Sequence, residues 1–276
     1  MLIYNKTIIW GLNEYSKYLL ESTNIKVDFI FDKFSKEKEY LNCKVINDIS
    51  ILKNKTIKKC IISSTTYYMD IIEELNNINK NIEIAHISNY IDGYPRTIII
   101  KNKEELINCK FIKGYIKGKV IINKCLILQL RHDTPVVINV NKNAELHFNN
   151  NILMDGVEIA AEENSKVSLG NRTYMSRFGM IRAKSLIEIG SNCVISWNVV
   201  IMDNDGYSLV GSNTKNSFVK IGSNIWIGNS VNILKNTDIG FGSMVGSMSK
   251  LSGKFMGKSL IVGNPAKIIK KDIVWE

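Results

Sequence analysis

A period of six residues constrains the fold of this chain more than any other feature of its sequence. Aliphatic residues stand six positions apart, with one gap, at Ile189, Ile195, Ile201, Ile221, Ile227, Ile233, Ile239 and Val245. Glycine follows five of these eight residues. Three such hexads make one triangular coil, in which the aliphatic side chain points inward and glycine admits the turn at a corner. The period therefore predicts a parallel β-helix whose coils stack on their aliphatic side chains.

The same period is less regular before residue 187. Two earlier series keep the spacing, namely Leu169, Met175, Ile181 and Ile187, and before them Val140, Leu146 and Ile152. A slip of two residues separates the later series from Ile189. These residues indicate earlier coils with irregular corners. Upstream of residue 165 an ordinary β-sandwich accounts for the pattern as well, so both folds remain open there.

The interruption between Ile201 and Ile221 predicts a functional site. It is 20 residues long and holds the segment Met202-Asp203-Asn204-Asp205-Gly206-Tyr207, followed by a polar stretch. A solenoid that interrupts its coil often does so to build a site. Asp203 and Asp205 are its candidate acid–base residues. The alternative is that this acidic pair belongs to a solvated loop tip or an Asx turn.

Residues 1–92 have a different pattern, in which apolar strands alternate with helical segments. We expect strands at 7–11, 27–31, 60–64 and 82–85, and helices at 13–21 and 67–78. This order is typical of a parallel sheet with crossover helices. The chain is therefore expected to consist of an α/β domain over residues 1–92 and an all-β domain over residues 93–276.

One spacing in the α/β domain resembles that of dinucleotide-binding folds. Asp32 lies 21 residues after Gly11, roughly where those folds place the acid that binds the ribose. However, the turn at Gly11 keeps one of the three glycines that let a pyrophosphate approach the backbone, which argues against NAD binding. A nucleotide-sugar site and a purely structural or interface role both remain open.

The composition favours a cytoplasmic protein without a transmembrane segment. The net charge is +10, nearly all of it beyond residue 97, and most of these lysines are expected to serve solubility rather than nucleic-acid binding. No apolar run is long enough to span a bilayer, and residues 1–11 lack the features of a signal peptide. The five cysteines are scattered, which indicates reduced thiols rather than disulfides or a metal site.

Residues 187–273 resemble the hexapeptide-repeat acetyltransferases that modify sugars of surface polysaccharides. The matching segments are Ile189-Gly190, Ser196-Trp197-Asn198-Val199, Ile201 to Gly206, Ile225-Trp226-Ile227-Gly228, Ile239-Gly240 and Gly263-Asn264-Pro265-Ala266-Lys267. The resemblance implies a left-handed β-helix, a homotrimer, and acetyl-CoA as the cosubstrate in a groove between neighbouring subunits. The α/β domain is similar to the small N-terminal domain of PglD-type sugar acyltransferases.

The resemblance also implies roles for particular residues. Contacts to acetyl-CoA fall on Trp226, Gly228, Gly246, Ser247, Lys254 and Lys267, and contacts to the acceptor fall on Trp197 and Asn198. In this family the acceptor hydroxyl attacks the thioester directly, backbone N–H groups stabilise the oxyanion, and a histidine two residues beyond the second aspartate takes the proton. That position is Tyr207 here. A phenol, with a reference pKa of about 10, is a poor base at neutral pH, so the candidate catalytic residues are Asp203, Asp205 and Tyr207.

These features leave more than one function open. The first is an acetyl-CoA-dependent acetyltransferase that acts on a sugar or nucleotide-sugar in polysaccharide or glycan synthesis, with Tyr207 in place of the usual histidine. The second is a catalytically silent relative that binds a sugar, a nucleotide-sugar or a protein partner, as the missing histidine suggests. A structural β-helix or another transferase chemistry is the third, because a fold does not fix a function.

Overall fold

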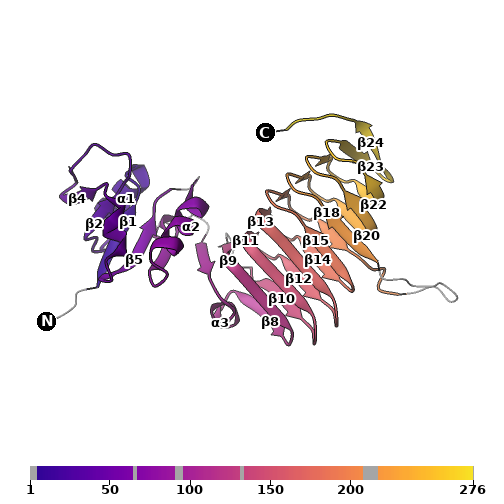
Figure 1. The fold of residues 1–276 in the computed structure, drawn as a ribbon, viewed down its shortest axis with the longest axis horizontal. Helices are drawn as coiled ribbons and strands as arrows, with labels where there is room; N and C mark the ends of the chain where they lie inside the picture. Colours follow the sequence, from indigo (N-terminus) through magenta and orange to yellow (C-terminus); the bar gives the residue numbers. More distant parts are fainter. Residues whose placement is uncertain (1–4, 65–66, 91–95, 131–133, 208–216, 276) are drawn as a thin grey trace. The chain divides into compact units, whose positions relative to one another are not determined.

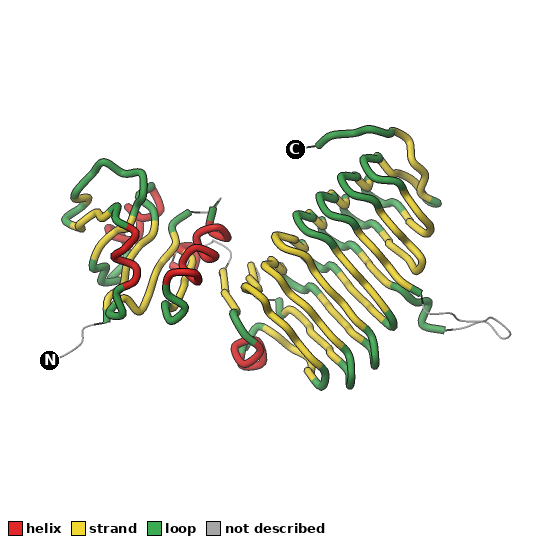
Figure 2. Tube along the Cα trace, in the orientation of Figure 1, coloured by secondary structure: helices red, strands yellow, loops and turns green. Residues whose placement is uncertain are grey.

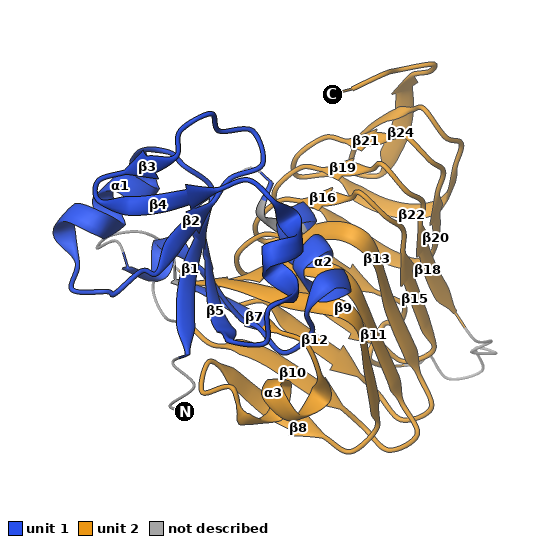
Figure 3. Cartoon of the chain, turned by 60° about the vertical axis from the view of Figure 1, so that its left-hand side comes forward, with its two compact units in different colours: residues 1–99 blue, residues 100–276 orange. Residues whose placement is uncertain are grey.

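The computed structural model describes residues 5–64, 67–90, 96–130, 134–207 and 217–275. The chain forms two compact units, residues 1–99 and residues 100–276 (Figure 3). The domain boundary expected between residues 92 and 93 lies outside the described residues. Within the described ranges, no helix is both long enough and apolar enough to cross a membrane.

The first unit is an α/β unit on a mainly parallel sheet, as its sequence pattern predicts. The sheet order is β3-β4-β2-β1-β5-β6, and neighbours pair in parallel except β3 with β4. The strands are β1 (Lys6–Trp10), β2 (Phe29–Phe31), β3 (Glu39–Tyr40), β4 (Cys43–Ile46), β5 (Ile57–Ile62) and β6 (Glu83–His86). The helices are α1 (Glu14–Ser22), α2 (Tyr68–Ile78) and the short 3-10 helices η1 (Ile49–Lys53) and η2 (Ile87–Tyr90). The sequence pattern does not predict the short strands β3 and β4.

The turn after β1 is closed by side chains of the unit itself. Gly11 has a φ of +105°, and a Cβ at this position would lie 2.5 Å from the Ser63 hydroxyl oxygen, so glycine is required. Asp32 accepts a hydrogen bond from the Leu12 N–H at 2.8 Å with one oxygen and two more from the loop that follows β2 with the other. The carboxylate in the position of a ribose-binding acid is therefore used to hold this turn.

The second unit is a parallel β-helix that follows α3 (Lys103–Asn108) (Figures 1 and 2). Strand β7 (Arg96–Ile100) spans the boundary between the units. The strands of the coils are β8 (Ile112–Ile116), β9 (Lys119–Leu130), β10 (Val136–Val140), β11 (Glu145–Met154), β12 (Glu158–Ala161), β13 (Lys166–Met175), β14 (Met180–Ala183), β15 (Leu186–Ile189), β16 (Val194–Ile195), β17 (Val200–Met202), β18 (Phe218–Ile221), β19 (Trp226–Ile227), β20 (Asn232–Ile239), β21 (Met244–Val245), β22 (Lys250–Phe255) and β23 (Leu260–Gly263). The hairpin partner of β23 is β24 (Ala266–Lys270), which pairs antiparallel with it.

The coils stack into three parallel sheets, which we call the first, second and third faces in the order in which the chain visits them, beginning with β8. The inward columns are Ile159, Ile181, Ile201, Ile233 and Leu251 on the first face, Leu169, Ile189, Ile221, Ile239 and Phe255 on the second, and Met175, Ile195, Ile227, Val245 and Ile261 on the third. All of these side chains are buried. Full burial of one such side chain stabilises the fold by about 1.5–3 kcal/mol, so the hexad period marks the contacts that hold the coils together.

The β-helix also extends upstream of residue 165, where the sequence leaves a β-sandwich open. Strand β10 pairs in parallel with both β8 and β12, and β11 pairs in parallel with both β9 and β13. Strands β9, β11 and β13 are long because each runs from the second face through a corner into the third face. These continuous strands explain why the period is less regular there.

Three corners connect the faces, and we number them in chain order. The first corner joins the first face to the second face, and the second corner joins the second face to the third face. The third corner joins the third face to the first face of the next coil. At the second corner, a Cβ at Gly190 would lie 2.6 Å from the backbone of Gly222, so the in-phase glycines allow the coils to stack. Asn192 and Asn224 follow with a φ of 55°, a left-handed conformation that asparagine tolerates well. Upstream, Arg172 occupies this position instead, which weakens the sequence signal.

Candidate functional site at the corners of the β-helix

The coil interruption leaves the β-helix at the first corner, after β17, and returns at β18 (Figure 1). Both flanking strands keep their places in the stack, because Ile201 pairs with Ile233 and Ile221 pairs with Ile189. The interruption is therefore an excursion from one corner. Residues 208–216 of this excursion lie outside the described residues, so the structure places its stems and the segment up to Tyr207.

Asp203 is the residue at which the chain leaves the corner, and it is fully buried. One carboxylate oxygen accepts the Lys184 N–H at 2.7 Å, and the other accepts the Ser185 and Leu186 N–H groups, also at 2.7 Å. These three donors belong to the same corner of the preceding coil. The Ser217 hydroxyl donates to the carbonyl oxygen of Asp203, which ties the returning end of the excursion to its start.

Asp205 lies on the exposed part of the excursion and is bound to the following coil. Its carboxylate forms an ion pair and hydrogen bond with Lys235, whose side chain comes from the first corner of that coil. Between them, Asn204 accepts the Gly206 N–H at 3.0 Å, so the Asx turn in this segment is formed by the asparagine and by neither aspartate. Lys235 was not a sequence candidate, because its pairing depends on the stacking of two coils that are separate in sequence.

Tyr207 ends the described part of the excursion, and its side chain is 94% exposed. Among the described residues its hydroxyl has no hydrogen-bond partner. Tyr207, which takes the position of the usual histidine, is therefore accessible to solvent. It lies two residues after Asp205, which is paired with Lys235.

The third corner gathers the predicted acceptor residues and part of the predicted cofactor residues. The Asn198 side chain donates to the Ser230 hydroxyl of the next coil at 3.2 Å, and Trp197 is 55% exposed beside it in sequence. One coil further, Ser247 donates to the Asn229 side chain at 2.7 Å. The corner thus exposes an indole ring next to a ladder of amide and hydroxyl groups.

The predicted cofactor glycines at the third corner have a structural reason to be glycine. A Cβ at Gly228 would lie 2.7 Å from the Ser247 backbone nitrogen, and one at Gly246 would lie 2.9 Å from the Val262 side chain. Contacts this short do not occur in well-packed structures, so both glycines permit the coils to stack.

The remaining predicted cofactor residues lie away from the third corner. Trp226 is on the outward side of the third face, 41% exposed, with its ring centroid 6.4 Å from that of Trp275. Lys254 is exposed on the second face, in register with Asp238, and Lys267 is exposed on β24. Within a single chain, the excursion and these cofactor candidates therefore occupy different corners and faces.

The two histidines that the structure describes belong to elements other than the excursion. His86 is buried in the first unit, 2.8 Å from the Ser88 hydroxyl, and burial lowers the pKa of its imidazole. His147 lies on the second face, 2.9 Å from Glu145. His132 lies outside the described residues. Within the described ranges no group of three or more His, Cys, Asp or Glu side chains has the arrangement of a metal site.

Comparison with known proteins identifies relatives of the β-helix. No protein-family model matches the chain. The chain is 31% identical over 136 residues to a polysialic acid O-acetyltransferase of Escherichia coli O1:K1 / APEC, a match that covers 47% of this chain and 43% of that protein. The chain therefore spans less than half the length of this curated relative.

Solved structures similar to the chain include two acetyltransferases of polysialic acid. The polySia-specific acetyltransferase NeuO is 26% identical with a TM-score of 0.53, and the match covers 60% of this chain and 78% of NeuO. The polysialic acid O-acetyltransferase OatWY is 27% identical with a TM-score of 0.41, over 60% of this chain and 90% of OatWY. The sequence match to the E. coli protein and the likeness to NeuO confirm the resemblance to hexapeptide-repeat acetyltransferases and the predicted left-handed β-helix.

Proposed function

We propose that this chain, whose β-helix has the fold of the hexapeptide-repeat acetyltransferases, is an acetyl-CoA-dependent acetyltransferase that acts on a sugar or nucleotide-sugar. The similarity in sequence to a polysaccharide O-acetyltransferase carries the proposal. It is supported by an excursion at the first corner that holds two aspartates and Tyr207. Because the relatives are named for polysialic acid, an acidic polysaccharide is the first acceptor to test.

The outward side of the third face supports the proposal of a homotrimer. The register aligns Tyr174, Val194, Trp226, Met244 and Leu260 from five successive coils in one apolar column. The corresponding column of the second face is His147, Ser168, Glu188, Lys220, Asp238 and Lys254. An apolar column that runs through five coils is typical of a surface that another protein covers, and a second copy of this chain is the partner that the resemblance implies.

A site shared between two copies accounts for the separation of the candidate residues in one chain. In a closed three-fold assembly each chain offers the same two surfaces to its neighbours. We place the first-corner excursion of one chain opposite the third corner and third face of the next. Acetyl-CoA then lies between them, with Trp226, Gly228, Gly246 and Ser247 along its pantetheine arm, and with Lys254 and Lys267 as cationic partners for its phosphates.

The reaction that this arrangement supports is direct transfer. The acceptor hydroxyl attacks the thioester carbonyl while its proton is removed, and the collapse of the tetrahedral intermediate releases the thiol of coenzyme A. Asp203, with both oxygens bound by backbone N–H groups, is a positioning residue that fixes the excursion. Asp205, oriented by Lys235, is the candidate proton acceptor, and Tyr207 is the candidate contact to the acceptor. Trp197 and Asn198 are the candidate acceptor residues at the third corner.

The alternative function is that of a silent relative that binds a sugar or a partner without transfer. It is favoured by the absence of a histidine at position 207. The release of coenzyme A thiol from acetyl-CoA, measured with a panel of acidic polysaccharides, sugars and nucleotide-sugars, separates the two functions. Thiol release that depends on an acceptor supports the enzyme, while acetyl-CoA binding without release supports the silent relative.

The proposed reaction is consistent with a cytoplasmic location. Among the described residues no cysteine is assigned to a disulfide, and four of the five are buried. Free thiols persist in a reducing compartment, which is also the compartment that supplies acetyl-CoA.

A further inference from the structure

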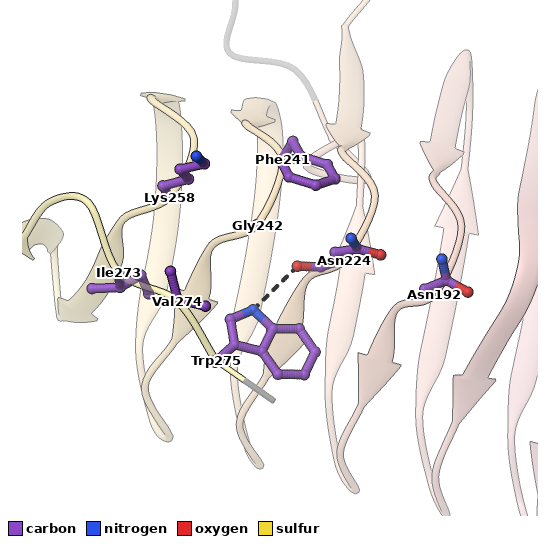
Figure 4. Close-up of a pocket in the computed structure, with 8 residues that line it drawn as sticks. All are labelled: Asn192, Asn224, Phe241, Gly242, Lys258, Ile273, Val274 and Trp275. Atoms are coloured by element: carbon purple, nitrogen blue, oxygen red, sulfur yellow. Dashed lines mark hydrogen bonds between the residues drawn. The ribbon is translucent and has the colours of Figure 1, made fainter.

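A hollow at the second corner has a lining that shares no residue with the set proposed for acetyl transfer, although its Trp275 ring lies beside Trp226, with the ring centroids 6.4 Å apart. Figure 4 shows it between the corners of successive coils and the C-terminal segment that passes over them. Its volume is about 280 Å³, and it is lined by Asn192, Asn224, Phe241, Gly242, Lys258, Ile273, Val274 and Trp275. Pockets for small molecules measure about 300–1,000 Å³, so a hollow of this size accommodates a group about as large as one sugar ring.

The C-terminal segment forms one wall of the hollow because two hydrogen bonds fix it. The Ile273 N–H donates to the Lys258 carbonyl oxygen at 3.0 Å, and the Ile273 side chain is buried. The Trp275 indole N–H donates to the Asn224 carbonyl oxygen at 3.2 Å (Figure 4). The indole ring is thereby held over the corner with its N–H group satisfied, which leaves the apolar ring surface to meet a ligand.

The polar side chains of the hollow are not used within the chain. Among the described residues, the side-chain amides of Asn192 and Asn224 and the ammonium group of Lys258 have no hydrogen-bond or ion-pair partner. Asn192 and Asn224 occupy equivalent positions on consecutive coils, so their amides are separated by roughly the 4.8 Å spacing of neighbouring strands. Two amides at this spacing can bind two hydroxyl or acetamido groups of one sugar ring.

The combination of these groups selects the class of ligand. The aromatic rings of Trp275 and Phe241 offer apolar surfaces for the C–H groups of a sugar ring. Lys258 supplies one point charge, which suits a carboxylate. A nucleotide is larger than the hollow, and its phosphates call for more than the single cation present here.

We propose that this hollow binds a carboxylated sugar residue of a polysaccharide. The site contacts the acceptor chain away from the reacting centre, so that successive sugar units are held while one of them is modified. Binding at this site does not depend on acetyl transfer, and it can be measured whether or not the chain is an active enzyme.

The test is an NMR titration of the full chain with a short oligomer of sialic acid as the probe. The same oligomer with its carboxylates reduced to alcohols is the neutral control. We expect Lys258→Met to weaken binding of the acidic oligomer by about ten-fold, since it removes the cation that pairs with the carboxylate. Trp275→Ala should weaken the binding of both the acidic and the neutral oligomer. Lys142→Met, which removes an exposed charge from the first corner of an early coil, is the matched control and should leave binding unchanged.

Three outcomes would contradict the proposal that the hollow binds a carboxylated sugar. One is that the acidic oligomer does not bind, and another is that Lys258→Met and Trp275→Ala bind it as the natural chain does. The third is displacement of the oligomer by 3′,5′-ADP, which would make the hollow part of the cofactor site. Acetyl-CoA binding and thiol release are measured separately on the same variants. The results therefore distinguish a hollow that does not bind the sugar from a chain that does not transfer acetyl groups.

Discussion

At the scale of single residues, Tyr207 is the position where this chain departs from the pattern it resembles. If the site is otherwise intact, Tyr207→His should raise acetyl transfer, because an imidazole with a reference pKa of about 6.5 takes a proton near neutral pH, a role worth about a hundred-fold or more. If Tyr207 instead positions the acceptor, the same change should lower transfer and raise KM. Steady-state kinetics of Tyr207→His and Tyr207→Phe distinguish these cases, since the phenylalanine keeps the ring and removes the hydroxyl. Transfer that is unchanged in both variants would place Tyr207 outside the site.

Asp203 gives a prediction about stability. Asp203→Ala removes the acceptor of three backbone N–H groups in the first corner. Buried donors left without an acceptor are costly, so the free energy of unfolding should fall by on the order of 3 kcal/mol, and transfer should fall with it. Asp205→Ala is the matched control, because its carboxylate is exposed and pairs with a surface lysine. Equal thermal midpoints for the two variants would contradict the anchoring role of Asp203.

The sequence identifies these two aspartates and cannot tell their roles apart. Their difference arises from the preceding and following coils, which supply backbone N–H groups to Asp203 and the ammonium group of Lys235 to Asp205. Both sets of partners lie far from the aspartates in sequence. The Asx turn was expected at one of the aspartates, and the structure has it at Asn204 between them.

At the scale of elements, the hexad period predicts the inward columns of the β-helix because each aliphatic side chain contacts its equivalent one coil away. The corners are less predictable, since a left-handed conformation is occupied by Asn192 in one coil and by Arg172 in another. The contact of the C-terminal segment with the second corner was not predicted from the sequence. That contact depends on Trp275, a single residue outside any repeat.

The lysines of the second face and of β24 give a prediction about the cofactor. Acetyl-CoA binding should weaken as salt is raised, because its phosphates are anionic and the cations are exposed. Calorimetry of a Lys254→Met, Lys267→Met double variant should show several-fold weaker binding with a shallower dependence on salt. Lys142→Met should behave as the natural chain does. Binding that is indifferent to salt and to the double variant would remove both lysines from the cofactor site.

At the scale of the whole molecule, the proposed shared site requires a homotrimer. Light scattering should give the mass of a trimer, and replacement of Trp226 by Glu should favour the monomer, because it sets a charge in the apolar column of the third face. The matched control is Lys220→Glu on the charged second face, which should leave the trimer intact. A natural chain that is monomeric at working concentration would contradict the shared site.

A shared site also predicts complementation between inactive variants. One variant carries Asp205→Ala and Tyr207→Ala in the excursion, and the other carries Trp226→Ala on the third face. Each alone should be inactive, whereas their co-expression should restore part of the activity, since mixed trimers contain some interfaces with both natural surfaces. Activity that stays absent in purified mixed trimers would indicate that each site lies within one chain.

Mass spectrometry of the acceptor is the most direct test of the proposed acetyl transfer. The purified chain is incubated with acetyl-CoA and a panel that includes polysialic acid, and the excursion variant serves as the control. If the chain is the proposed acetyltransferase, the acceptor gains acetyl groups in step with the coenzyme A thiol released, and both are lost in the control. Acetyl-CoA that stays intact with every acceptor, or acetylation that is equal in the excursion variant, would contradict the proposed acetyl transfer.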